Sequence, residues 1–239
     1  MPPLELSDSD AAEVLARGEL EVLGRMPWAS NATLLAVARA DGVEMQAIYK
    51  PRRGERPLWD FPSGTLCQRE VATYELSDAL GWGLVPPTVL RDGPVGIGMV
   101  QQFVDHDPEE HYFTLLEEHA DRFLQFAVFD VLINNADRKG GHCIRGPDGT
   151  IVGIDHGLTF HPAWKLRTVI WDFAGDAVPP ELADDVCRVL ADEELGERME
   201  PLISSLEVEA VEQRAQELVR AGRLPDPDPG YHSLPWPLV

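Results

Sequence analysis

Short apolar, β-prone stretches are separated by polar bends and turn residues along much of the first hundred residues, which is typical of β-strands. Five such stretches predict strands over residues 20–23, 33–38, 43–49, 85–90 and 95–104. Asp41-Gly42 separates the second and third stretches and is typical of two-residue hairpins, because both turn positions tolerate positive φ. Pro51 ends the third strand, since proline has no N–H group for the ladder.

A helix is predicted over Leu66–Leu80, because Gly81 and Gly83 directly after it favour a helix end. Asp105–Glu110 is polar and contains Pro108, so we expect a connector there. Beyond it the pattern is mainly that of helices. This half is predicted to contain a buried helix over residues 117–132, a polar loop over 134–141 and a hairpin over 143–154. Two further helices are predicted over 181–194 and 206–221, and an extended segment rich in Pro and Trp over 225–239.

The chain has 239 residues and a formal net charge of −21. Such an acidic surface repels DNA, RNA and anionic lipid head groups, so we expect no nucleic-acid partner and no stable membrane association. No apolar run reaches the roughly 18 residues of a membrane helix, and the acidic Met1–Asp10 is unlike a signal peptide. The three cysteines are widely spaced, which argues against a disulfide framework. The expected location is therefore the cytoplasm.

Lysine is rare in this chain, because only Lys50, Lys139 and Lys165 are lysines among 20 basic side chains. Lysine offers a compact, movable point charge where arginine offers a planar fork, so each of the three is a candidate for a specific task. Residues 137–170 are also locally basic, with five basic residues against three acids. We expect an anionic ligand to bind in this part of an otherwise acidic chain.

Four charged residues follow an order that suits phosphoryl transfer. Lys50 ends the third predicted strand, and Glu70 lies in the helix after it. Asp137 lies in the polar loop, and Asp155 follows the hairpin eighteen residues later. A triphosphate needs a cation at its phosphates, a carboxylate that holds this cation, and an acid for the metal ion. Lys50, Glu70 and Asp155 fit these tasks, while Asp137 can position the acceptor hydroxyl.

Five further residues are predicted to bind the nucleotide. Ser30, Asn31 and Thr33, between the first two strands, offer hydroxyl and backbone N–H groups to the terminal phosphates. Their loop contains no glycine, so it is neither the Gly-rich loop of protein kinases nor a Walker loop. Gln102 and Val104, at the end of the fifth predicted strand, complete the predicted nucleotide site.

Three segments resemble those of a known group of kinases. Ile133–His142 is similar to the catalytic loop of phosphatidylinositol 3-/4-kinase-like and HipA-like kinases, which carry an Asp-Arg-His…Asn pattern. Ile154–Gly157 resembles their Asp-Phe-Gly metal motif, and Arg69–Tyr74 resembles the helix that bears the partner of the nucleotide lysine. Over about residues 20–180, the chain is similar to the actinobacterial family of phosphatidylinositol 3-/4-kinase-related proteins.

The resemblance implies an α+β, two-lobed, protein-kinase-like fold. Its N-lobe, residues 1–104, would hold an antiparallel sheet with one helix, and its C-lobe, residues 105–239, would be mainly helical. It also implies ATP with Mg²⁺ or Mn²⁺ as cofactors. By analogy Lys50 matches the nucleotide lysine, Asp137 the catalytic aspartate and Asp155 the metal-binding aspartate.

Two positions depart from the family pattern. Lys139 stands where a histidine is expected, and His142 stands where an asparagine that binds the second metal is expected. A neutral imidazole can still bind metal, but its nitrogen favours Mn²⁺ or Zn²⁺ over Mg²⁺ more than an amide oxygen does. His142 is therefore a predicted metal ligand beside Asp155.

Two other functions remain open. A pseudokinase would bind nucleotide and use the folded state to engage a protein partner, and the departures at Lys139 and His142 favour it. A metal-dependent hydrolase would need a cluster of four ligand-type side chains, namely His142, Asp155, His156 and His161. That hypothesis leaves Lys50 and Glu70 unexplained. For a kinase, the acceptor is an unknown hydroxyl of a protein or small molecule rather than a phosphoinositide, because the acidic chain lacks a membrane anchor.

Overall fold

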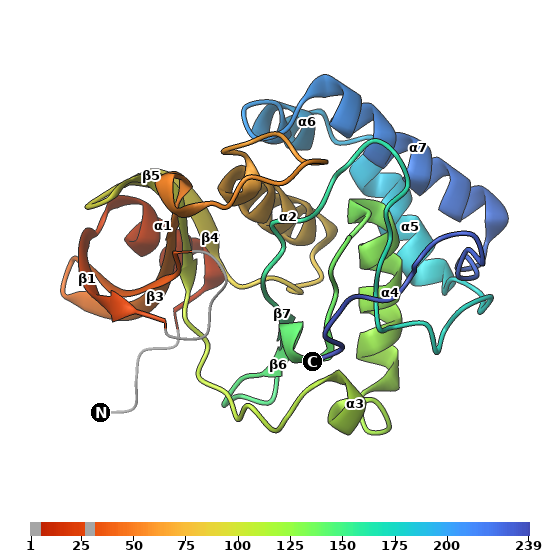
Figure 1. Ribbon diagram of the computed structural model, residues 1–239, viewed down its shortest axis with the longest axis horizontal. Helices are drawn as coiled ribbons and strands as arrows, with labels where there is room; N and C mark the ends of the chain where they lie inside the picture. Colours follow the sequence, from red (N-terminus) through yellow and green to blue (C-terminus); the bar gives the residue numbers. More distant parts are fainter. Residues whose placement is uncertain (1–5, 27–31) are drawn as a thin grey trace.

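The first hundred residues of the chain build one antiparallel sheet with the strand order β1-β2-β3-β5-β4 (Figure 1). The computed structural model describes residues 6–26 and 32–239. The strands of this sheet are β1 (Glu19–Arg25), β2 (Leu34–Ala40), β3 (Val43–Pro51), β4 (Thr88–Gly93) and β5 (Gly96–Gln102). After β3 the chain passes through α2 (Leu66–Leu80) to the edge strand β4, and β5 returns between β4 and β3.

The hairpin between β2 and β3 turns where the sequence predicts. Asp41 has φ of 51° and Gly42 has φ of 80°, both in the left-handed region that this dipeptide tolerates. Ala40 pairs with Val43 across the turn, so the whole register of the two strands is fixed by these two residues. The ladder of β3 extends one residue beyond Lys50.

A helix that the sequence analysis did not predict precedes the sheet. In α1 (Asp8–Arg17), Ser7 is the N-cap, and its Oγ accepts a hydrogen bond from the Asp10 N–H group at 3.1 Å. The buried side chains of α1 are Ala11, Val14 and Leu15. Their spacing of three and four is that of an amphipathic helix, but the apolar stripe is short and lies in a strongly acidic segment.

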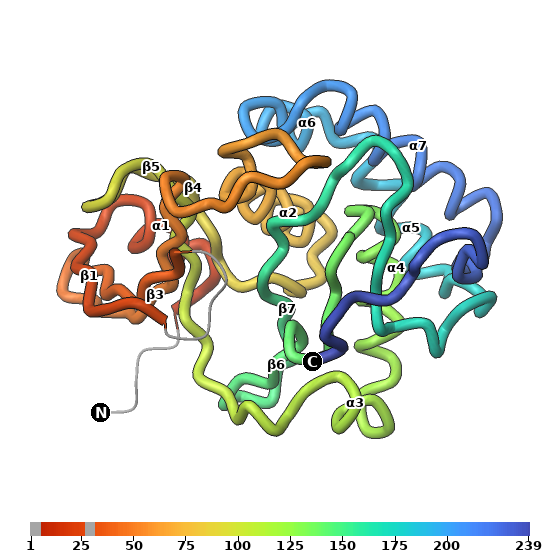
Figure 2. Tube along the Cα trace, in the orientation of Figure 1, coloured from red at the N-terminus to blue at the C-terminus, as the bar shows by residue number. Residues whose placement is uncertain are grey.

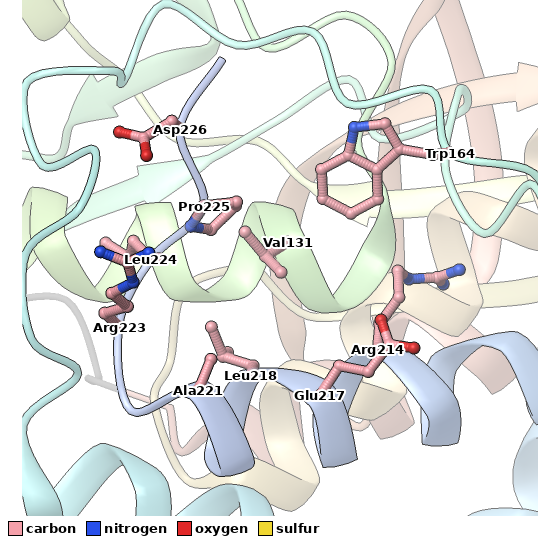
Figure 3. A pocket seen from close by; sticks show the side chains of 10 residues that line it. All are labelled: Val131, Trp164, Arg214, Glu217, Leu218, Ala221, Arg223, Leu224, Pro225 and Asp226. Carbon is pink, nitrogen blue, oxygen red and sulfur yellow. The ribbon is translucent and has the colours of Figure 1, made fainter. Parts of the chain in front are cut away.

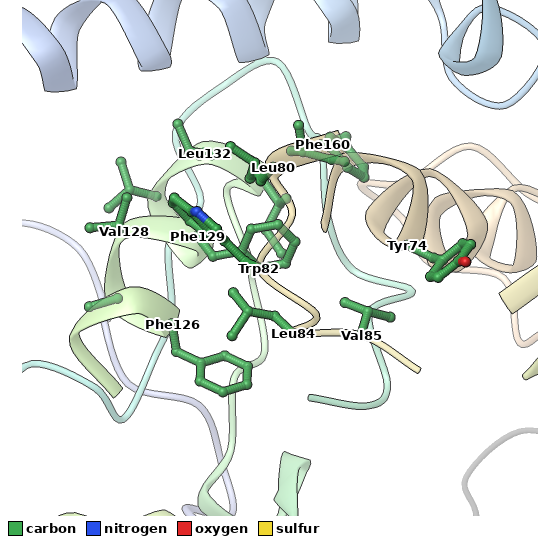
Figure 4. Close-up of a cluster of buried hydrophobic side chains, with 14 of the residues drawn as sticks. Tyr74, Leu80, Trp82, Leu84, Val85, Phe126, Val128, Phe129, Leu132 and Phe160 are labelled. Carbon is green, nitrogen blue, oxygen red and sulfur yellow. The ribbon is translucent and has the colours of Figure 1, made fainter. Parts of the chain in front are cut away.

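Two main hydrophobic cores support the fold, and Phe61, Leu66 and Ala136 form a small third cluster. The smaller core lies between α1 and the sheet and consists of Val14, Leu15, Leu20, Ala36, Ala38, Ala47, Tyr49 and Val100. The larger core joins α2 to α4 (Ala120–Ile133) and to the helices that follow. In Figure 4, Leu80 of α2 lies with Trp82 beside Phe129 of α4. Apart from Leu66, the buried apolar side chains of α2 thus belong to the core of the helical part, although α2 lies between two strands in the sequence.

The second half is mainly helical, as predicted (Figures 1 and 2). Its α4 is buried almost all round and ends at Asn134, which has φ of 50°. The remaining elements are η1 (Arg52–Gly54), α3 (Tyr112–Leu115), η2 (Gly140–His142), β6 (Cys143–Arg145), β7 (Ile151–Gly153), α5 (Pro180–Leu190), α6 (Glu193–Met199) and α7 (Ser205–Ala221). None of the helices in the described ranges is both long and apolar enough to cross a membrane.

Two differences from the predicted elements have a local cause. β4 begins at Thr88 rather than at residue 85, because Pro86 and Pro87 cannot donate to a ladder and Val85 packs into the larger core. The helix predicted over 181–194 ends at Leu190, and Asp192 caps the separate helix α6. The antiparallel sheet and the helical part confirm the predicted α+β class, while the division at residue 104 stays a prediction.

A buried ion pair ties α2 to α7. Arg69 of α2 is 1% exposed and donates to Glu207 of α7 and to the carbonyl of Thr159. Its guanidinium also lies 5.1 Å from the centre of the Phe61 ring. Burial alone would raise the pKa of Glu207, but hydrogen bonds from Ser204 and Arg69 lower that pKa below its ordinary value.

Glu207→Gln is expected to lower the free energy of unfolding by about 1–3 kcal/mol, because the buried Arg69 loses a charged acceptor. A carboxyl group with a lowered pKa stabilises the fold above its unfolded pKa, and this stabilisation is lost as the pH falls through the folded pKa. The difference from the parent should therefore be full at pH 7 and shrink below about pH 4. Urea denaturation at several pH values measures this difference in the free energy of unfolding, and the exposed Glu209→Gln is the control. A difference that is the same at all pH values would contradict the predicted role of the Glu207 carboxylate.

Candidate active site

Lys50 of β3 pairs in the sheet with Met99, and its side chain reaches α2. Its Nζ donates to Glu70 Oε1 at 2.5 Å and to Asp155 Oδ1 at 2.8 Å. Only 3% of the Glu70 side chain is exposed, and its Oε2 accepts a hydrogen bond from the His156 N–H group at 3.2 Å. Lys50 therefore joins the sheet, α2 and the segment after β7 at one point.

One cation between two carboxylates sets the electrostatics of this cluster. Burial alone would lower the pKa of Lys50, but the charges of Asp155 and Glu70 raise that pKa above its ordinary value, so the ammonium group stays charged. Lys50 holds the pKa of Asp155 well below its usual range, whereas burial raises the pKa of Glu70. With both carboxylates ionised, the three groups carry a net negative charge, which suits a site for a divalent cation.

Asp155 presents its carboxylate from a strained backbone. Its φ of 61° lies in the left-handed region, which costs a residue other than glycine about 1–3 kcal/mol. Its Oδ2 faces His142 Nε2 at 3.6 Å, and 52% of the Asp155 side chain is exposed against 13% for His142. Burial lowers the pKa of His142 to about 4, so the ring is neutral near pH 7, and its Nδ1 accepts a hydrogen bond from the Lys139 N–H group at 3.4 Å. The two predicted metal ligands thus lie side by side.

Asp137 lies in the loop after α4, where its N–H group donates to Asn135 Oδ1 at 3.0 Å. Its Oδ2 is 3.0 Å from Lys139 Nζ, and 27% of its side chain is exposed. Burial raises the pKa of Asp137 and Asp155 adds to this rise, although Lys139 and Arg167 oppose it. A raised pKa makes this carboxylate a better proton acceptor than an ordinary aspartate, which is what a general base requires.

A buried hydrogen-bond network lies beneath this loop, and the sequence analysis did not identify it. Asp130 of α4 is fully buried and accepts hydrogen bonds from Arg138 at 2.9 Å and from Asn135 at 3.0 Å. Thr168 Oγ1 donates to its other oxygen at 3.2 Å. Arg138, which is also buried, lies 2.7 Å from His156 Nε2. The network therefore anchors the loop that bears the predicted catalytic aspartate and the residue that follows the predicted metal ligand.

Of the residues predicted to meet the terminal phosphates, Ser30 and Asn31 lie outside the described residues. Thr33 is buried, and its carbonyl accepts a hydrogen bond from the Met26 N–H group at 2.9 Å. β2 begins one residue after Thr33 and pairs there with the residue before Lys50, so Thr33 and Lys50 lie at the same end of the sheet.

Gln102 and Val104 lie where β5 passes into the connector. The Gln102 N–H group donates to the carbonyl of Pro87 at 2.9 Å, and the Val104 carbonyl lies 2.9 Å from His106 Nδ1. The Val104 N–H group forms no hydrogen bond with any residue of the described ranges. The structure thus leaves a backbone donor free at the end of the sheet.

The remaining histidines do not build a metal centre. His156 is buried beside Arg138, and the His161 ring packs edge-on against Phe61 with centroids 5.4 Å apart. Within residues 6–26 and 32–239, no group of three or more His, Cys, Asp or Glu side chains is arranged to hold a metal ion by itself. The hydrolase hypothesis therefore lacks its ligand set, and a metal ion at Asp155 needs further oxygen ligands from a bound nucleotide or water.

A pocket of about 250 Å³ lies elsewhere in the helical part, between α4, α7 and the segment after α7 (Figure 3). Val131 and Leu218 form part of its apolar wall, and the Trp164 ring lies across from them (Figure 3). None of the predicted site residues within the described ranges lines it. This pocket is thus separate from the cluster around Lys50.

The sequence of this chain is similar to those of known proteins. The family model described as phosphatidylinositol 3- and 4-kinase matches residues 91–210. Protein Rv2133c of Mycobacterium tuberculosis is 42% identical over 272 aligned residues, which cover 98% of this chain and 97% of that protein. This chain belongs to the phosphatidylinositol 3- and 4-kinase family. Because this relative is mycobacterial, the predicted resemblance to actinobacterial members of the family is confirmed.

The fold of a solved kinase agrees with this family. The crystal structure of a Helicobacter pylori proinflammatory kinase, CtkA, superposes with a TM-score of 0.54 at 13% sequence identity. The match covers 87% of this chain and 94% of that chain. At this identity the similarity shows the fold alone, and it confirms the predicted two-lobed kinase-like architecture. The chain is therefore a kinase-like protein of the phosphatidylinositol 3- and 4-kinase family.

Proposed function

We propose that this chain binds ATP with a divalent metal ion and transfers the γ-phosphoryl group to a hydroxyl acceptor. The observation that carries the proposal is the position of Lys50 Nζ, 2.5 Å from Glu70 and 2.8 Å from Asp155. A triphosphate requires a cation held by a buried carboxylate, next to a carboxylate that can take a metal ion. A bound phosphate would share Lys50 with Glu70 and leave Asp155 to the metal ion.

Asp155 and His142 are the residues that would hold Mg²⁺ or Mn²⁺. A carboxylate and a neutral imidazole, with Oδ2 and Nε2 3.6 Å apart, are donors that a divalent ion accepts. When bound, the ion neutralises negative charge on the phosphate oxygens. The imidazole nitrogen favours Mn²⁺ more than the amide oxygen of an asparagine would.

His142→Asn is therefore expected to shift the metal preference of nucleotide binding from Mn²⁺ towards Mg²⁺, because an amide oxygen replaces the nitrogen donor. Calorimetric Kd values for ATP with each ion measure the shift. His119→Asn, at the start of α4, serves as the control. If the ratio of the two Kd values stays the same, His142 is not a ligand and Asp155 holds the metal ion with water or phosphate alone.

The remaining contacts to the nucleotide fall at the ends of the sheet. The free N–H group of Val104 supplies a donor for the base, and Gln102 lies beside it at the end of β5. Ser30, Asn31 and Thr33 supply hydroxyl and backbone groups for the terminal phosphates. The proposed division into an N-lobe, residues 1–104, and a C-lobe, residues 105–239, places these groups in the first lobe and the metal ligands in the second.

Asp137 orients the acceptor hydroxyl and takes its proton. As the hydroxyl oxygen forms its bond to the γ-phosphorus, the bond to the leaving ADP oxygen breaks and the proton passes to the Asp137 carboxylate. Burial, which raises the pKa of Asp137, supports this role. The acidic chain supports a protein or small-molecule acceptor in the cytoplasm rather than a phosphoinositide.

One observation favours the alternative of a nucleotide-binding pseudokinase. Lys139 Nζ lies 3.0 Å from Asp137 Oδ2, so the carboxylate already has a partner that competes with an acceptor hydroxyl. A protein of this kind would bind ATP through Lys50 and engage a protein partner through its folded state. The two functions differ in turnover, not in nucleotide binding.

Lys50→Met is expected to weaken ATP binding by roughly 10- to 150-fold, which corresponds to the loss of about 1.5–3 kcal/mol from a charge-assisted hydrogen bond. Glu70 can take up a proton in the variant, because burial already raises its pKa, so the fold should persist. Isothermal titration calorimetry with Mg²⁺ and with Mn²⁺ measures the Kd.

Lys165→Met is the matched control for this variant. Lys165 is also ion-paired, with Asp60 at 2.9 Å, and 14% of its side chain is exposed against 18% for Lys50. This control should bind ATP like the parent. Equal affinity in both variants would remove Lys50 from the site, and a parent that binds neither ATP nor ADP at millimolar concentration would reject the proposal.

A further inference from the structure

The last residues of the chain return to the predicted catalytic loop. After α7 the segment 225–239 runs back across the helical part, and its end lies beside β6 and β7 (Figures 1 and 2). The same part of the fold holds η2 (Gly140–His142), which begins three residues after Asp137. Contacts at three points along this segment fix its path.

The first two contact points use backbone carbonyl groups of the segment. The Thr168 N–H group donates to the carbonyl of Ser233 at 3.1 Å, and the indole N–H group of Trp171 donates to the same carbonyl at 3.0 Å. Further along, the Gly140 N–H group donates to the carbonyl of Leu238 at 2.7 Å. The segment therefore binds by its main chain to both the catalytic loop and the stretch after the metal motif.

The contact at Gly140 requires a residue without a side chain. A Cβ atom at this position would lie 2.9 Å from the Phe113 ring and 3.3 Å from the Leu238 carbonyl oxygen. A larger residue would therefore push against both Phe113 and the bound segment. The close approach of a carbonyl to the loop depends on the glycine.

The third contact point is an aromatic ring under a cation. The Arg167 guanidinium lies 5.0 Å from the centre of the Tyr231 ring. In the described ranges Arg167 has no carboxylate partner within ion-pair distance, although its charge acts on the pKa of Asp137. Tyr231 thus covers a cation whose charge acts on Asp137, while the Leu238 carbonyl binds the loop that follows Asp137.

We propose that the surface formed by Gly140, Thr168, Trp171 and Arg167 is a docking track for an extended polypeptide, which residues 231–239 occupy in cis. The proposal rests on the proposed function and specifies its acceptor as a protein segment that must displace these residues before it reaches Asp137. Peptide recognition through main-chain groups is tolerant of sequence and is a recurring mode in proteins.

The chemistry of the track favours a polypeptide over a lipid. Two backbone N–H groups and one indole N–H group point at peptide carbonyl oxygens, which recur along any extended chain. A lipid head group would need a cluster of free cations, but Lys165 is already paired with Asp60 and Lys139 with Asp137. With a net charge of −21, the chain as a whole also opposes an anionic bilayer.

The test compares the full chain with Tyr231→Ala, which removes the ring under Arg167, and with Tyr231→Phe, which keeps it. Hydrogen exchange at the Gly140 and Thr168 amides is expected to be at least tenfold faster in Tyr231→Ala and unchanged in Tyr231→Phe. Tyr231→Ala combined with Trp171→Phe, which removes the indole donor, should increase exchange further. Protection that persists in this double variant would overturn docking in cis.

A second arm asks what the released track binds. A fluorescent peptide of residues 225–239 should bind Tyr231→Ala, whose track keeps all its donors, and not the parent, and phosphatidylinositol vesicles should not compete with it. Vesicle binding without peptide binding would overturn the proposal in favour of a lipid surface. Phosphoryl transfer to the peptide or to water should rise in Tyr231→Ala; unchanged transfer despite faster exchange would overturn the proposal that residues 231–239 limit access to Asp137. Failure of ATP binding would instead reject the proposed function, since exchange and peptide binding need no nucleotide.

Discussion

Asp137→Asn is expected to lower the turnover number of phosphoryl transfer by about 10²–10⁴-fold, because an amide cannot take the proton of the acceptor hydroxyl. The Kd for ATP should stay close to that of the parent, since Lys50 and Asp155 make the proposed contacts to phosphate and metal. Steady-state kinetics and calorimetry on the same preparations separate the two quantities.

The control for this variant is Asp148→Asn. Asp148 lies in the turn between β6 and β7, where its carboxylate accepts hydrogen bonds from Thr150, and its loss should leave turnover unchanged. If the parent binds ATP but shows no turnover, so that Asp137→Asn has nothing to lower, the chain is a pseudokinase. Turnover that survives Asp137→Asn would assign the base to another group.

Asp130→Ala is expected to lower the free energy of unfolding by about 3–5 kcal/mol, because it leaves the fully buried charge of Arg138 without its partner. Asp121→Ala, an exposed acid in the first turn of the same helix, should cost about 1 kcal/mol or less. Guanidinium denaturation monitored by circular dichroism measures both values.

A charge-free double variant separates the ion pair from the rest of the packing. Asp130→Leu with Arg138→Met removes both buried charges and should recover much of the stability lost in Asp130→Ala. If the double variant is as unstable as the single one, the surrounding hydrogen bonds to Asn135 and Thr168 carry the stability instead. Because these bonds anchor the catalytic loop, recovery of stability need not restore turnover.

The cluster around Lys50 could be predicted from the sequence because its members end regular elements. Lys50 ends a strand that Pro51 limits, Glu70 lies one turn into a helix, and Asp155 follows a hairpin. When neighbouring strands and helices pack against one another, their ends meet at the same edge. Charged residues at these ends, although far apart in the sequence, therefore lie close together in the fold. The hairpin at Asp41 was predictable for a similar reason, since a two-residue turn fixes the register locally.

The buried network could not be predicted, because its pairing depends on how α4 packs against the loop. Arg138 follows Asp137 directly in the sequence, yet Arg138 pairs with Asp130 and Asp137 pairs with Lys139. One signal was present: Asp130 is the single acid among the buried residues of α4. A charge inside an apolar helix requires a buried partner.

Helix α1 was missed for a different reason. Its apolar stripe consists of Ala11, Val14 and Leu15 in an acidic segment, so periodicity alone is weak evidence. Its cap at Ser7 and its packing on the sheet make the helix stable, and packing is a property of the whole fold.

The division of the apolar side chains into two cores has a mechanical consequence. Lys50 extends from a sheet whose core it shares with α1, whereas Glu70 belongs to a helix packed into the other core. The larger core also includes Met99 of β5, and β4 and β5 contact α2, so the ion pair adds a polar contact to the apolar packing between the sheet and α2. A nucleotide bound at Lys50 would therefore add one more link between the sheet and α2, and it should slow hydrogen exchange in both elements together.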